Sequence, residues 1–215
     1  MTEATRNDPA MKPPSSDDLS RLRSIAEQGR SAPLLGGWHL VLWGSAIALA
    51  LLINWAVAER ILPWPSYSLA ISWFGIVILA WIGSALLGRS EAKRPGAFSV
   101  GNQVERAAWT TAGAFLGLLS LALFARAAAG DPQAWDMFAV MPPVTFGAYA
   151  IALHASAVAA DSGTSKPYIV VALAFGAATA FLIGNPIQYL AAAAGILLVS
   201  VPPGLGHLRA ARRAD

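Results

Sequence analysis

Long blocks without a single charged residue dominate this sequence. They cover residues 31–58, 61–88, 107–125, 137–160 and 167–208. Each is longer than the roughly 18 apolar residues that cross a bilayer as an α-helix. Only 13% of the chain is charged, whereas an ordinary soluble domain has roughly a quarter of its residues charged. We therefore predict an all-α fold, a polytopic transmembrane helix bundle.

The last block is too long for one helix. Near its middle the sequence Gly184-Asn185-Pro186 is typical of a tight turn, so we divide the block into two spans. The fifth span is rich in Gly and Ala, and a re-entrant segment is its alternative. The chain is thus predicted to have six spans, at residues 38–57, 67–87, 107–125, 137–160, 168–183 and 187–201.

The basic residues indicate the orientation of these spans. Lys and Arg favour the cytoplasmic side of short loops. With the N-terminus inside, the external loops carry only Arg60 and Arg126, and Arg89, Lys93 and Arg94 are cytoplasmic. We predict an N-in/C-in topology with the first span as an uncleaved signal anchor. Arginine outnumbers lysine and alanine is abundant, which suggests a GC-rich genome and a bacterial inner (plasma) membrane.

The polar segments lie mostly at the two ends of the chain. Residues 1–16 are predicted to be a disordered tail, since they contain too little apolar surface to offset the entropy of ordering. Residues 17–30 are predicted to form a cytoplasmic or interfacial amphipathic helix, an arm whose apolar face carries Leu19, Leu22 and Ile25. The six-helix bundle would occupy residues 36–205, and residues 206–215 would be a basic cytoplasmic tail.

Three polar residues within or at the edge of the spans are candidate ligands. A polar side chain in hydrocarbon is costly, which makes it a functional candidate by default. His154 lies deep in the fourth span, His39 lies at the inner edge of the first, and Asn54 lies near its outer end. For His154 we expect either a hydrogen bond to a neighbouring helix, near Ser156 or to Thr110, or a role as a ligand for a haem or a pigment or as part of a proton pathway.

Backbone-breaking and small residues mark two further features. Pro142 and Pro143 remove two backbone donors inside the fourth span, which predicts a helix break whose free carbonyls need partners, with Thr145 near enough to help. A static kink and a gate are both compatible with this pattern. Gly113 and Gly117 form a GxxxG step, and we expect it to pack within the chain's own bundle. The remaining features of this kind are a weaker small-residue pair, Gly44 and Ala48, and Pro202-Pro203, which we expect to end the last helix.

The residues needed for most enzyme classes are missing from the sequence. The chain has no cysteine, no HExxH, no phosphate-binding glycine loop and no Asp, Glu or His cluster at metal-ligand spacing. It also lacks the Ser and His pattern of a six-span intramembrane protease. We predict that the protein is not an enzyme and has no cofactor or metal. Nucleic acid is excluded as a partner because the basic residues follow the membrane topology.

These observations favour a non-enzymatic accessory, regulatory or scaffold subunit that binds other membrane proteins. Its expected partners are the lipid bilayer and another membrane protein or complex. The main alternative is a small transporter or channel that uses the proline-broken fourth helix, Asn54 and His154. A binder of a lipid or an apolar cofactor is a further alternative.

Overall fold

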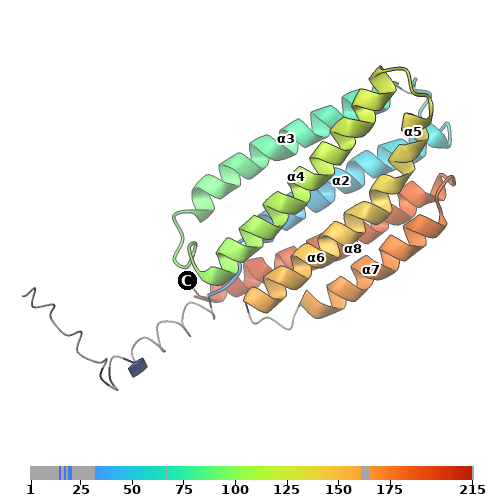
Figure 1. Ribbon diagram of the computed structural model, residues 1–215. Helices are drawn as coiled ribbons and strands as arrows, with labels where there is room; N and C mark the ends of the chain where they lie inside the picture. Colours follow the sequence, from blue (N-terminus) through green and yellow to red (C-terminus); the bar gives the residue numbers. More distant parts are fainter. Residues whose placement is uncertain are drawn as a thin grey trace, which may run out of the picture.

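The computed structural model describes residues 15, 17, 19–20, 32–65, 67–160 and 165–214. All regular elements in this part of the chain are helices, which Figure 1 shows running side by side in one elongated bundle. They are α2 (Gly37–Ala58), α3 (Tyr67–Glu91), α4 (Val100–Ala128), α5 (Gln133–Met137), the 3-10 helix η1 (Phe138–Val140), α6 (Met141–Ala159), α7 (Lys166–Phe181) and α8 (Ile187–Ala214).

Five of the described helical segments are long and apolar enough to cross a membrane. They are α2, α3, α4, the run Gln133–Ala159 formed by α5, η1 and α6, and α8. The predicted fifth span corresponds to α7, which is apolar but has only 16 residues. The prediction of an all-helical, multi-pass membrane protein is therefore confirmed, with five candidate spans.

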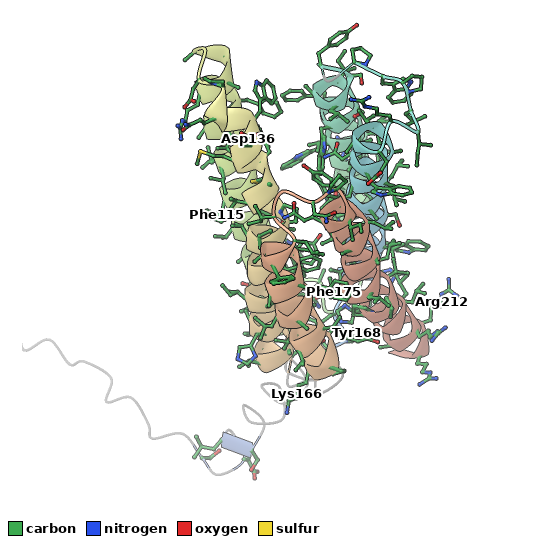
Figure 2. The ribbon with its side chains drawn as sticks, turned by 90° about the vertical axis from the view of Figure 1, so that its right-hand side faces the viewer. Phe115, Asp136, Lys166, Tyr168, Phe175 and Arg212 are labelled. Atoms are coloured by element: carbon green, nitrogen blue, oxygen red, sulfur yellow. The ribbon has the colours of Figure 1, made fainter. Side chains whose placement is uncertain are left out.

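The centre of the bundle lies between α2, α6, α7 and α8. The closely packed helix pairs are α2 with α8, α6 with α7, α4 with α6, α7 with α8, and α2 with α3. Phe146, Leu153, Ile196 and Val199 are fully buried in the main core cluster. Figure 2 shows Lys166 and Arg212 at one end of the bundle and Asp136 toward the other. Charged side chains thus lie at both ends of an apolar middle.

The packing of α2 against α8 depends on glycines at three positions. A β-carbon on Gly44 would lie 2.4 Å from the β-carbon of Ser200. The backbones of Gly37 and Gly204 approach each other so closely that a β-carbon on Gly37 would lie 2.6 Å from the Gly204 carbonyl oxygen. Small residues let two helix backbones come this close, as is common in membrane bundles.

The turn between α7 and α8 has the predicted location and residues. Gly184 has a φ of +86°, a conformation that residues with a β-carbon rarely adopt. The Asn185 side-chain oxygen accepts a hydrogen bond from the Ile187 amide at 3.0 Å, at the start of α8. The division of the last apolar block into two helices is confirmed.

The two prolines of the fourth apolar segment occupy the first turn of α6, directly after η1. Pro143 cannot donate to the Ala139 carbonyl four residues earlier. The Gln188 side chain of α8 donates to that oxygen instead, at 2.7 Å, and also to the Thr179 carbonyl at 2.9 Å. The Phe138 carbonyl accepts from the Met141 amide. The partner of the freed Ala139 carbonyl is thus Gln188, and the suggestion of Thr145 was wrong.

The last helix does not end at its prolines. α8 continues through Pro202 and Pro203 to Ala214, and the expectation of a helix end there was wrong. Beyond the prolines, Gly204 still packs against α2, and Leu208 and Ala211 are buried. These contacts stabilise the helix beyond a point at which an isolated helix would break, so most of the predicted tail is helical.

Candidate functional site

Asn102, near the start of α4, forms hydrogen bonds to the part of the chain just before α2. The buried Asn102 side-chain oxygen accepts from the Leu35 amide at 2.8 Å. Its nitrogen lies 3.0 Å from the carbonyl oxygens of Pro33 and Gly96, and 3.0 Å from the Ser99 hydroxyl. One amide side chain therefore connects residues 33–35, which we call the strap, with the α3–α4 turn.

A carboxyl group and an imidazole meet one turn further along α4. Glu105 and His207 of α8 are 4% and 9% exposed, and Glu105 Oε1 lies 3.6 Å from His207 Nδ1. The other oxygen, Oε2, accepts from the Gly36 amide at 3.2 Å. A β-carbon on Gly36 would lie 2.9 Å from the carboxylate, so a larger residue at this position would require the Glu105 side chain to shift.

A second carboxyl and imidazole pair lies at the same end of the bundle. His39 Nδ1 of α2 is 3.3 Å from Glu91 Oε2, at the last residue of α3. His39 Nε2 lies 3.2 Å from the Ser84 carbonyl oxygen. The two pairs are neighbours, and Glu105 is close enough to His39 and Glu91 to interact with both electrostatically. We call these four residues, Glu91, Glu105, His39 and His207, the His–Glu cluster.

Several atoms of the His–Glu cluster have no hydrogen-bond partner among the described residues. They are Glu91 Oε1, Glu105 Oε1 and both ring nitrogens of His207, all inaccessible to solvent. Buried polar atoms without partners are costly and uncommon in folded proteins. A cavity of about 80 Å³ adjoins this region, lined by Ser165, Tyr168, Pro202, Pro203, Gly206 and His207. Within the described residues, no group of three His, Asp or Glu side chains is arranged to hold a metal ion.

The predicted polar candidates lie at separate places. His39 belongs to the His–Glu cluster. Asn54 accepts a hydrogen bond from the Trp73 indole at 3.1 Å and so connects α2 with α3. His154 is exposed on α6, and its imidazole has no hydrogen-bond partner among the residues that the structure describes. Among the described residues no hydrogen bond joins His154 to Asn54, and the expected hydrogen bond of His154 to Thr110 is not formed.

The glycines of α4 face outward. Gly113 and Gly117 are exposed, and no described atom beyond the helix itself lies within 4 Å of the position that a β-carbon would occupy on either. The expectation that they pack inside the bundle was therefore wrong. The small residues that pack inside the bundle are Gly44 and Ala48, the weaker pair of the sequence analysis, which are both buried.

The remaining predicted site is the amphipathic arm. Leu19 is exposed and lies in a helical stretch, whereas Leu22 and Ile25 lie outside the described residues. The apolar face proposed for the arm therefore stays a prediction.

Glu91, Asn102, Glu105 and His207 were not predicted from the sequence as site residues. The third span was predicted to begin at residue 107, which placed Asn102 and Glu105 in a loop, but α4 begins at Val100. The predicted last span ended at residue 201, which left His207 in a tail. One signal in the sequence could have indicated the true start of α4, because serine is a preferred N-cap residue. In the structure Ser99 caps α4, and its side chain accepts a hydrogen bond from the Asn102 amide.

Comparison with known proteins adds no family to this description, because no protein-family model, no curated protein and no solved structure matches the chain.

Proposed function

We propose that this protein is a non-enzymatic accessory or scaffold subunit that binds another membrane protein through the outward face of α4. The observation that carries the proposal is the exposure of Gly113 and Gly117 at helical spacing. Thr110, also exposed, lies one turn before Gly113 on the same face. We call Thr110, Gly113 and Gly117 the α4 glycine face.

A helix fits this face better than lipid does. Glycines leave a shallow groove that brings a second backbone close, which strengthens van der Waals contact between helices. Lipid chains pack well against large apolar side chains such as the exposed Leu79 of α3, but they gain little contact over glycine. The Thr110 hydroxyl can also bond to a partner helix, which a lipid chain cannot do.

The proposed setting is a bacterial inner membrane, with six spans and both termini in the cytoplasm. Its support is the distribution of basic residues and the apolar character of α7. We expect reporter fusions after Arg60 and at Pro132 to be external, and fusions at Gln103, Ser165 and the C-terminus to be cytoplasmic. An external C-terminus would contradict the six-span arrangement without bearing on the α4 glycine face.

Site-specific photo-crosslinking tests the proposed contact. A photoreactive amino acid at Ala114, which is exposed beside Gly113, is expected to give one discrete product with another protein in native membranes. The control is the same probe at Leu173, an exposed residue on α7. A product of twice the chain's own mass would identify a second copy and contradict the accessory-subunit proposal. Lipid adducts alone at both positions would also contradict it.

A small transporter or channel is the second candidate. The observation that favours it is the His–Glu cluster beside a cavity, and not the predicted pair of Asn54 and His154. Ion-coupled carriers place ionisable groups inside a bundle in this way.

A further inference from the structure

A cavity of about 80 Å³ lies between the start of α7 and the later part of α8. Its polar lining residues are Ser165, Tyr168 and His207. Ser165 and His207 are only 2% and 9% exposed, and neither ring nitrogen of His207 has a hydrogen-bond partner among the described residues. A cavity needs only about 10–15 Å³ of such space to hold one water molecule. This one therefore has room for a polar group of several heavy atoms.

A hydroxyl group suits the polar lining of this cavity. In a neutral imidazole one ring nitrogen donates and the other accepts, and no hydrogen bond to a described residue fixes the tautomer of His207. A hydroxyl both donates and accepts, so it can bond to His207 in either tautomer and to the hydroxyls of Ser165 and Tyr168. The ring nitrogens are shielded from solvent, so the imidazole has to turn toward the cavity when the group binds. Such side-chain changes are common on binding.

Three exposed cations lie next to residues that line the cavity. Lys166 follows Ser165 in the chain. Arg209 and Arg213 lie three and seven residues after Gly206, on the same face of α8. None of the three cations forms an ion pair with another residue that the structure describes. An anion bound beside the cavity would therefore meet unpaired positive charge.

These cations lie at the depth of lipid headgroups. α8 belongs to a candidate membrane span, and at about 1.5 Å per residue its first 20 residues or so, up to Gly206, cover about 30 Å. That is the thickness of the hydrocarbon layer, which a polar headgroup layer of roughly 5–8 Å borders on each side. Arg209 would lie about 5 Å further along the helix. The anion present at this depth is a lipid phosphate.

We propose that the cavity and the three cations form a binding site for an anionic phospholipid whose headgroup carries a free hydroxyl, such as a glycerol headgroup. The lipid phosphate binds Lys166, Arg209 and Arg213, in the manner of the basic pockets between membrane helices that bind anionic headgroups. The hydroxyl end of the headgroup occupies the cavity. The acyl chains lie along α7, where Val170 and Leu173 are exposed on the same face as Lys166. The site is independent of the α4 glycine face.

Thermal unfolding of the full chain in micelles of a neutral detergent tests the proposal with defined lipids. A ligand that binds only the folded state raises the unfolding temperature. Phosphatidylglycerol should raise it, whereas phosphatidylcholine with the same acyl chains should not, because its quaternary ammonium cancels the phosphate charge. Phosphatidylethanol has the same charge as phosphatidylglycerol but no free hydroxyl, and so it should bind more weakly. The proposal fails if phosphatidylglycerol and phosphatidylcholine stabilise the chain equally.

Water-soluble glycerol phosphate distinguishes a lipid site from a site for a free phosphate ester. It carries the same phosphate and hydroxyl groups but no acyl chains, so it should stabilise the chain far less than phosphatidylglycerol does at equal concentration. Equal stabilisation would identify a soluble ligand and contradict the assignment to a lipid.

The double variant Arg209→Gln with Arg213→Gln tests the cations. It should weaken the binding of phosphatidylglycerol about thirtyfold, the usual contribution of two basic residues beside an anionic headgroup. The matched control, Arg89→Gln with Lys93→Gln, removes two exposed cations at the end of α3 and in the turn after it. Because salt screens distant charges, this control should weaken binding by about threefold at most. An equal loss in both double variants would show a diffuse attraction and no site.

Gly206→Leu tests the place of the headgroup in the cavity. Gly206 lines the cavity, and no described atom beyond α8 itself lies within 4 Å of the position of its β-carbon, so the variant should fold. The leucine should remove the preference for phosphatidylglycerol over phosphatidylethanol, because it takes the space of the hydroxyl. The control is Gly88→Leu on α3, an equally open position. A preference that persists unchanged in Gly206→Leu would overturn the assignment of the headgroup to the cavity.

Discussion

Replacing Gly44 with valine is expected to destabilise the fold by about 3 kcal/mol, at the upper end of the usual cost of overpacking. A β-carbon at this position would lie 2.4 Å from the Ser200 β-carbon, which is fixed to the α8 backbone and cannot rotate away. α2 and α8 would have to separate along the most extensive contact of the bundle. Thermal unfolding in detergent measures the loss.

Gly113→Val is the matched control for this prediction. It adds the same side chain to an apolar helix, but no described atom beyond α4 itself lies within 4 Å of the new β-carbon position. The unfolding temperature of the purified chain should change little. Equal destabilisation by the two variants would contradict the assignment of Gly44 to the core and of Gly113 to the surface.

Replacing Asn102 with alanine is expected to cost about 1–3 kcal/mol of stability. The variant leaves the buried Leu35 amide without its partner, and an unpaired buried group costs about 1–3 kcal/mol. Asn102 also bonds to the carbonyls of Pro33 and Gly96, but Pro33 is half-buried and Gly96 is exposed, so water can replace those bonds. The strap should separate from α4, which limited proteolysis would detect. Unfolding experiments on the same protein give the magnitude.

The neighbouring Gln103 supplies the control. Its amide group is exposed and donates to the Phe98 carbonyl at 2.6 Å. Because water can replace that bond, Gln103→Ala should change stability by no more than about 0.5 kcal/mol. Comparable losses in the two variants would show that Asn102 has no special role in holding the strap.

The apolar helices could be predicted from the sequence because hydrocarbon requires long uncharged segments. The turn at Gly184 was predictable for a local reason, since its conformation needs glycine. The ends of the helices were harder to predict from the sequence, because α4 and α8 extend into polar sequence where tertiary contacts stabilise them. Those extensions carry Glu105 and His207, so the predicted spans excluded both members of the buried pair.

The direction in which a small residue faces was not predictable from spacing alone. Gly44 and Gly113 both lie in apolar helices at the four-residue spacing of small residues, yet one is buried and the other is exposed. The difference depends on which helices are neighbours in space. Gln188 shows the same dependence, because its two carbonyl partners lie on η1 and at the end of α7. Nothing in the local sequence links these groups.

The most direct test of the α4 proposal is the crosslinking yield from Ala114 when the glycine face is intact and when it is filled. Gly113→Leu combined with Gly117→Leu should leave the purified chain folded, since both positions are open. The same change should abolish the product with the partner protein, because leucines would keep the second helix at a distance. A discrete product that persists undiminished in the double variant would contradict the proposal that this face binds another membrane protein.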